Sequence, residues 1–161
     1  MEIITRNREE TLALGKNLGE SLQPGDIVLL FGDLGAGKTT FTQGIAHGLG
    51  MPKTEYVRSP TFTLVNEYQA KYPIYHIDLF RTESFAEIEN LGLEEFLFGQ
   101  GISVVEWAEK LYYSGKDSPS PGFGICSRIE VRISFTKENH RVFDIQWINM
   151  DQRPSSLFSL Q

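Results

Sequence analysis

The sequence predicts a three-layer α/β fold with a mostly parallel central sheet and an antiparallel edge hairpin, and three observations support this. Residues 27–31 form an unbroken apolar run, which is typical of a strand buried on both faces of a parallel sheet. A glycine-rich turn and then a helical pattern follow it directly, as at the start of a βαβ unit. Near the other end, residues 128–135 and 141–148 alternate apolar and polar positions, as the two strands of a hairpin do.

The first helix is expected before the buried strand. Asn7 followed by Glu10 is a helix-start pattern, because the two side chains can cap the free backbone groups of the first turn. Leu14 and Leu18 then have helical spacing. Residues 24–26, Pro-Gly-Asp, form a turn that separates this helix from the strand.

Further elements follow the glycine-rich turn. Phe41 and Ile45 lie on one face of a second helix. Ser84 with Glu87 opens a third helix, which we expect to be interrupted near Gly92. The remaining strand candidates are residues 61–68, 72–80 and 102–105.

Length and composition bound the class of protein. The 161 residues fit one domain, expected to span residues 1–150, with a poorly ordered tail at 151–161. The Ser-, Pro- and Gly-rich stretch 114–127 is expected to form a mobile surface loop. Fifteen Lys and Arg against 21 Asp and Glu give a net charge of −6, which argues against broad binding to DNA or other nucleic acid.

The compartment is expected to be the cytoplasm. Cys126 is the single cysteine, so no intrachain disulfide can form, and a reducing environment is the simplest one. The N-terminus lacks the basic and apolar regions of a signal peptide. No apolar run approaches the roughly 18 residues that a membrane-spanning helix needs.

The glycine-rich turn carries the first functional motif. Residues 32–39, GDLGAGKT, match the phosphate-binding pattern G-x-x-x-x-G-K-[ST] between a buried strand and a helix. The glycines let backbone N–H groups turn inward around a phosphate, and the helix N-terminus adds partial positive charge. Lys38 is expected to reach the β- and γ-phosphates, and the Thr39 hydroxyl to bind Mg²⁺. The motif predicts a P-loop and a nucleoside triphosphate site.

A P-loop needs a second acid at the end of a neighbouring strand, and the chain offers two. Asp78 ends one apolar stretch and Glu106 ends another. His76 shares a strand face with Asp78, so the two side chains could act together on a phosphate or a water. The structural alternative for Asp78 is a helix cap or a hydrogen-bonded strand-end residue. Glu106 could instead be a solvated acid, and His76 a core histidine. The sequence leaves the roles of the two acids open.

A segment between the P-loop and the first acid is a switch candidate. Ser59, Thr61 and Thr63 could donate to a phosphate or to a metal-bound water, where P-loop proteins place a segment that senses the γ-phosphate. The alternative is a strand entry set by Pro60. Arg81 could neutralise transition-state charge or be merely solvated, and Trp107 could pack in the core or report on the site.

Four blocks of sequence, residues 32–40, 59–68, 76–81 and 105–107, together resemble the TsaE (YjeE) family of bacterial P-loop ATPases. The resemblance implies an ATPase that works on a complex of two paralogous partners, TsaB and TsaD. That complex adds a threonylcarbamoyl group to the adenosine next to the anticodon in tRNAs that read codons beginning with A. In this family, hydrolysis is thought to reset the complex between turnovers, and tRNA is reached through the complex.

The resemblance also assigns roles to residues. Thr39 and Glu106 look like the Mg²⁺ ligands, Asp78 is the favoured catalytic acid, and the block around Ser59 resembles the family's switch. The residues that resemble the ATP-binding set are Thr11, Gly35, Ala36, Gly37, Lys38, Thr39 and Thr40. Phe80 departs from the family, which often has Tyr there, and the stretch 114–127 is longer than the usual linker.

Two other functions stay open from the sequence. A nucleotide-gated binding module would carry the same motifs but use occupancy rather than turnover as its signal. A small-molecule kinase usually has an arginine-rich lid over the phosphates, whereas residues 111–124 carry only Lys116 as a basic side chain. A GTPase is disfavoured, because the chain has no Asn-Lys-x-Asp segment of the kind that reads guanine in that family.

Overall fold

The computed structural model describes residues 1–60, 62–112, 120–137 and 140–153. The strands are β1 (Glu2–Thr5), β2 (Ile27–Phe31), β3 (Val65–Tyr68), β4 (Ile74–Asp78), β5 (Ile102–Glu106), β6 (Arg128–Lys137) and β7 (His140–Ile148). The helices are α1 (Arg8–Ser21), α2 (Lys38–Gly48), α3 (Phe85–Glu89), α4 (Glu94–Leu97) and the 3₁₀ helix η1 (Ala108–Leu111).

All seven strands form one sheet in the order β1-β7-β6-β2-β5-β4-β3. Its centre is parallel, because β2 pairs parallel with both β5 and β6, and β4 pairs parallel with β5. The predicted hairpin is formed by β6 and β7, which pair antiparallel. The predicted α/β fold with a parallel core is thus confirmed, with antiparallel strands at both edges.

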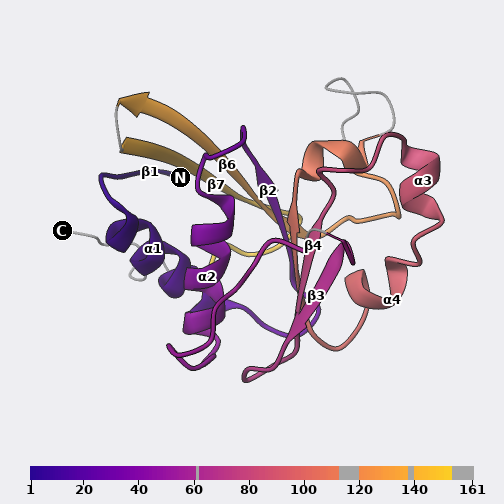
Figure 1. The fold of residues 1–161 in the computed structure, drawn as a ribbon, viewed down its shortest axis with the longest axis horizontal. Helices are drawn as coiled ribbons and strands as arrows, with labels where there is room; N and C mark the ends of the chain where they lie inside the picture. The colour runs from indigo at the N-terminus through magenta and orange to yellow at the C-terminus, as the bar shows by residue number, and fades with distance from the viewer. Residues whose placement is uncertain (61, 113–119, 138–139, 154–161) are drawn as a thin grey trace.

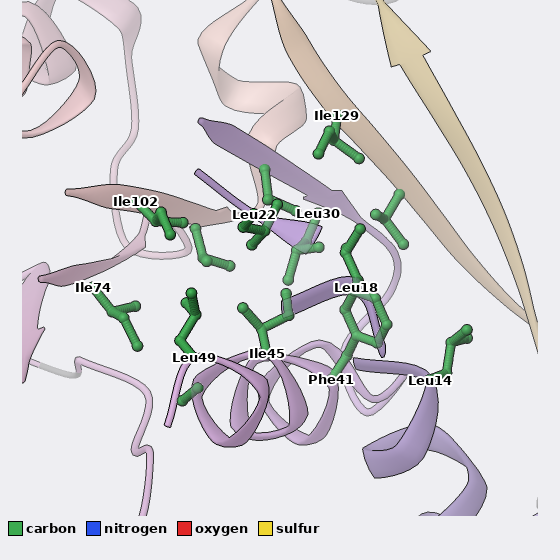
Figure 2. Packing of buried hydrophobic residues seen from close by; sticks show 14 of the residues in the cluster. Leu14, Leu18, Leu22, Leu30, Phe41, Ile45, Leu49, Ile74, Ile102 and Ile129 are labelled. Atoms are coloured by element: carbon green, nitrogen blue, oxygen red, sulfur yellow. The ribbon is translucent and has the colours of Figure 1, made fainter. Parts of the chain in front are cut away.

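Two helical layers cover the sheet (Figure 1). On one face, α1 and α2 bury Leu14, Leu18, Phe41 and Ile45 against the central strands, as the helical spacing predicts (Figure 2). On the other face, α3, α4 and η1 cover a second apolar cluster. The third helix is interrupted as expected, since α3 and α4 are two short helices separated at Gly92.

Glycines bring α1 unusually close to α2. A Cβ atom on Gly15 would lie 2.4 Å from the carbonyl oxygen of Phe41, and one on Gly44 would lie 2.4 Å from that of Leu12. These distances are too short for any side chain, so the two backbones touch directly. The contact fixes the N-terminal half of α1 beside the helix that starts at the P-loop.

Asn7 caps α1 as predicted. Its side chain accepts a hydrogen bond from the backbone N–H of Glu10, and the Glu10 carboxylate accepts one from the N–H of Arg6. Local sequence patterns do not predict β1, the strand just before this cap. β1 has only four residues and pairs with β7, a partner almost the whole chain away.

Three expectations need correction or limits. The strand predicted at 61–68 begins only at Val65, because Leu64 has a left-handed backbone with φ of 61°. The stretch 114–127 is not all surface loop, since Ile125 is 1% exposed and packs in the second cluster, while residues 113–119 lie outside the described chain. In the predicted tail, Arg153 pairs with the carboxylate of Asp26, and residues 154–161 are not described.

Among the described residues, no helix has both the length and the apolar character that crossing a membrane requires.

Candidate nucleotide site

The P-loop connects the end of β2 to the start of α2, at the carboxyl edge of the parallel strands. Gly35 and Gly37 have φ angles of 78° and 108°, in the left-handed region that other residues rarely adopt. Gly37 is the N-cap of α2 and accepts the N–H of Phe41 as the first bond of the helix. The sequence therefore needs glycine at these points to turn the chain from strand into helix. Ligands of α/β proteins bind at this edge of the sheet.

Lys38 is held inside the loop. Its Nζ donates to the carbonyl oxygens of Gly32 at 2.5 Å and Asp33 at 3.0 Å. The same ammonium lies 4.1 Å from the centre of the Trp107 ring, and the residue is only 5% exposed. Burial lowers the pKa of Lys38, although the carboxylate of Glu106 opposes the shift.

Glu106 ends β5 and joins two predicted candidates. Its Oε1 accepts a hydrogen bond from the Thr39 hydroxyl at 3.0 Å and lies 2.8 Å from Nε2 of His76. The Thr39 hydroxyl also lies 2.8 Å from that of Ser59. Because both Glu106 and His76 are buried, the bond between them is shielded from water. Nδ1 of His76 is buried with no hydrogen-bond partner in the part of the chain that is described.

Asp78 ends β4 directly beside Glu106 in the parallel register. Its Oδ1 accepts the backbone N–H of Phe80 at 2.9 Å, so the residue has the local hydrogen bond expected of a strand end. It is 9% exposed. Burial raises the pKa of Asp78 despite the bond from Phe80, and repulsion from Glu106 adds to the shift.

A pocket of about 390 Å³ opens over the loop and collects most of the candidates. It is lined by Gly35, Gly37, Lys38, Thr39, Thr40, Ser59, Asp78, Arg81, Glu106 and Trp107, together with Leu34, Pro60, Leu64 and Phe80. Residues from four separate stretches of sequence thus meet at one place. Leu34 and Leu64 were not predicted as site residues, because they stand at unspecified positions of the P-loop motif and of the block 59–68.

Four candidates do not line this pocket, and a fifth cannot be placed. His76 is fully buried behind Glu106, and Ala36 is a core residue at 1% exposure. The Thr63 hydroxyl donates to the carbonyl oxygen of Val65 within its own segment. Thr61 lies outside the described residues. Thr11 lines an adjoining pocket of about 210 Å³, which shares Gly37 and Thr40 with the first pocket.

The donor set fits a magnesium nucleotide. Mg²⁺ is usually held by one or two carboxylates, waters and substrate phosphates, and Thr39 with Glu106 supplies a hydroxyl and a carboxylate in contact. The described residues contain no cluster of three or more His, Cys, Asp or Glu that could hold a metal ion alone. Gly35 faces open space where a Cβ would stand, which leaves room for a phosphate.

This loop at the carboxyl edge of a parallel sheet places the chain in the class of P-loop NTPases, a class it shares with a solved relative. The crystal structure of YdiB from Bacillus subtilis matches with a TM-score of 0.72 at 34% sequence identity, covering 92% of this chain and 86% of that one. Within the class, the chain belongs to the family described as "Threonylcarbamoyl adenosine biosynthesis protein TsaE", whose sequence model matches residues 5–143.

Curated relatives carry the same name. The "tRNA threonylcarbamoyladenosine biosynthesis protein TsaE" of Bacillus subtilis is 52% identical over 105 residues, which cover 65% of this chain and 64% of the relative. The protein of that name from Rickettsia felis is 42% identical over 144 residues, or 89% of this chain and 78% of the relative. The chain thus matches slightly less than two thirds of the Bacillus relative's length. The family model and these relatives together confirm the predicted family.

Proposed function

We propose that this protein is the ATP-binding and ATP-hydrolysing subunit of a system that forms threonylcarbamoyladenosine in tRNA. The observation that carries the proposal is the hydrogen bond from Thr39 to Glu106 beside the buried Lys38. The lysine, the Thr39 hydroxyl and the strand-end acid all line one pocket. Membership of the TsaE family supplies the tRNA pathway.

Each residue of the pocket would have a distinct task. Backbone N–H groups of residues 35–40 would hold the phosphates, with Lys38 reaching the β- and γ-phosphate oxygens. Thr39 and Glu106 would hold Mg²⁺, which neutralises charge on those oxygens when bound. Arg81 lines the same pocket and could add positive charge near the γ-phosphate.

Asp78 is the proposed catalytic acid–base residue. During hydrolysis a water oxygen attacks the γ-phosphorus, the bond from that phosphorus to the β–γ bridging oxygen breaks, and the water loses a proton. A carboxylate whose pKa is raised by burial accepts that proton more readily than an exposed aspartate would. Glu106 is already engaged by Thr39 and His76, so Asp78 is the freer of the two acids.

His76, Ser59 and Trp107 are proposed to support the site. His76 would orient Glu106 from behind, and Ser59 would link the switch segment to Thr39. The Trp107 ring contacts the Lys38 ammonium. The environment of that ring would change when phosphate oxygens replace the loop carbonyl oxygens as hydrogen-bond acceptors of Lys38. Thr61 and Thr63 stay candidates of the same switch segment.

Partners are proposed from the family resemblance. Proteins of the TsaB and TsaD type would bind this ATPase in the cytoplasm and carry the tRNA. The net charge of −6 supports an indirect contact with tRNA, since direct binding needs a basic face. Leu34 and Phe80 line the pocket and are 75% and 49% exposed. These two side chains would give the partners an apolar surface beside the nucleotide.

One observation favours a second function, a nucleotide-gated binding module without significant turnover. Lys38 is held by two carbonyl groups and capped by Trp107, so nucleotide must rearrange these contacts on binding. Such a rearrangement could signal by itself, without hydrolysis. The kinase alternative gains no support from the site.

The first experiment is ATP hydrolysis by the purified chain, alone and with TsaB- and TsaD-type partners, with Lys38→Ala as the control. We expect slow hydrolysis alone, strong stimulation by the partners and loss of both in the variant. Tight ATP binding without turnover in either mixture would favour the gated module. Phosphate transferred to a small metabolite would favour the kinase.

A further inference from the structure

Two loops leave the carboxyl edge of the sheet beside each other and form one wall of the nucleotide pocket. The loop after β4 brings Phe80 and Arg81 to the pocket, and the loop after β5 brings Trp107. The backbone N–H of Leu79 donates to the carbonyl oxygen of Glu106 at 3.2 Å, so the two loops separate only beyond these residues. A contact farther out must therefore fix the shape of this wall.

Lys110 makes that contact. It lies in η1, the 3₁₀ helix that begins directly after Trp107, and its backbone N–H donates to the Trp107 carbonyl oxygen at 3.1 Å. Its Nζ crosses to the loop after β4 and donates to the carbonyl oxygens of Phe80 at 2.6 Å and Thr82 at 2.7 Å. Hydrogen bonds from a charged donor are stronger than those between neutral groups. One ammonium group thus joins the two loops.

Arg81 lies between the two carbonyl groups that Lys110 binds. The peptide plane before Arg81 is held through the carbonyl oxygen of Phe80. The plane after it is held by the N–H of Thr82, which donates to the carbonyl oxygen of Leu79 at 3.1 Å. Because a residue has only two soft backbone dihedral angles, fixing both planes fixes the direction in which the Arg81 side chain leaves the backbone. That side chain lines the nucleotide pocket.

Both ends of this bridge rest on the second apolar cluster. Leu79, next to Phe80, and Leu111, next to Lys110, are fully buried in that cluster. Thr82 is also buried, and its hydroxyl donates to the carbonyl oxygen of Leu79 at 2.6 Å. Lys110 therefore connects two anchored points, and its bonds place the backbone around Arg81 relative to the core.

We propose that Lys110 is a positioning residue for ATP hydrolysis, which holds Arg81 at the phosphate end of the pocket by tying the loop after β4 to η1. The inference rests on the proposed function, because it takes Arg81 as the added positive charge near the γ-phosphate. Lys110 does not line the pocket itself, so it acts through Arg81 rather than on ATP. The competing role for Lys110 is a structural bond that stabilises the loops without affecting the chemical step.

A double-mutant cycle on partner-stimulated ATP hydrolysis separates these roles. Lys110→Met removes the ammonium and keeps an apolar stem of nearly the same length. We expect its kcat to fall about 10- to 100-fold and its KM for ATP to stay within about threefold, because displacing a catalytic group by about 1 Å has an effect of this size on the chemical step. The variant that combines Lys110→Met with Arg81→Ala should be no slower than Arg81→Ala alone.

Two further variants complete the design. Lys110→Arg should keep kcat within about threefold of the wild type, because a guanidinium can also donate to both carbonyl oxygens. Lys71→Met is the matched control, since it removes a lysine whose ammonium lies 5.4 Å from the centre of the Tyr72 ring and which does not line the pocket. It should leave kcat unchanged.

Three results would overturn the inference. If the effects of Lys110→Met and Arg81→Ala on kcat multiply, Lys110 does not act through Arg81. A Lys110→Met variant with a lower melting temperature but an unchanged kcat would show a structural bond only, and a normal kcat in Arg81→Ala would leave nothing to position. If Lys110→Met does not fold, Lys110→Gln carries the same cycle. A wild-type chain without partner-stimulated turnover would overturn the proposed function, and this inference with it.

Discussion

The ammonium group of Lys38 lies 4.1 Å from the centre of the Trp107 ring, while two carbonyl oxygens of the P-loop accept its hydrogen bonds. Trp107 itself has a left-handed backbone, with φ of 59° and ψ of 42°, directly after the metal-binding candidate Glu106. Such a conformation is strained for a bulky residue and tends to occur at functional sites. Under the proposed function, Lys38 must leave these two carbonyl oxygens before it can contact a phosphate.

Trp107 should therefore report nucleotide binding. When Lys38 turns from the carbonyls to phosphate oxygens, the charge above the indole moves, and we expect the emission of Trp107 to change. The chain has two tryptophans, so the measurement uses a Trp147→Phe background. ATP titrated into that variant should give a saturable fluorescence change that Lys38→Ala abolishes. A constant emission at saturating ATP would show that the stacked pair does not move.

Glu106 should control the effect of magnesium. Glu106→Gln keeps an oxygen that can accept from Thr39 but removes the charge, so we expect the Mg²⁺-dependent gain in ATP affinity to fall about 10- to 100-fold. Calorimetric titration with Mg²⁺ and with a chelator measures that gain. Glu109→Gln is the control, because Glu109 is an exposed acid whose charge also acts on Lys38. If the gain persists in Glu106→Gln, the metal role passes to Asp78.

Most of the fold followed from local patterns. The run at 27–31, the cap at Asn7 and the alternation of the hairpin each need only neighbouring residues, and the structure confirms all three. β1 could not be found this way, because four residues carry too little periodicity and their partner β7 is far away in the chain. The burial of Ile125 could not be predicted, because the surrounding stretch is rich in Ser, Pro and Gly. Its burial depends on the second apolar cluster, whose members are far away in the sequence.

The site was predictable only in part. The motif and the strand-end acids marked Lys38, Thr39, Asp78 and Glu106, since each follows a recognisable strand or glycine turn. The contact between His76 and Glu106 spans 30 residues and depends on the parallel register of β4 and β5. Arg141 enters the adjoining pocket from β7, and no sequence spacing connects it to the P-loop.

The glycine contact between α1 and α2 should be intolerant of even one methyl group. Alanine favours a helix over glycine by about 1 kcal/mol, but a Cβ on Gly44 would lie 2.4 Å from a backbone oxygen that cannot rotate away. Separating the helices costs about 1–3 kcal/mol, so Gly44→Ala should lower the melting temperature by several degrees. Glu20→Ala, an exposed position on α1, is the control. A melting temperature at or above that of the wild type would refute the close contact.

Asp78→Asn should separate stability from catalysis. Asparagine retains an oxygen for the N–H of Phe80, so the local hydrogen bond survives while the charge is lost. We expect ATP binding to persist and partner-stimulated turnover to fall about 10²- to 10⁴-fold, the usual contribution of acid–base catalysis. Retained turnover would remove Asp78 from the chemical step.

The same variant makes a prediction about pH, because burial raises the pKa of Asp78 above its ordinary value of 3.8. An acid with a raised pKa binds its proton more tightly in the folded state, so its stabilising effect is complete below pH 3.8 and is lost as the pH rises through the folded-state pKa. At neutral pH the buried charge destabilises the nucleotide-free protein, and Asp78→Asn should melt at a higher temperature than the wild type. The difference should shrink as the pH falls toward 3.8. Melting curves at several pH values measure it, and a variant less stable than the wild type at neutral pH would mean that the Asp78 charge is favourably paired rather than buried at a cost.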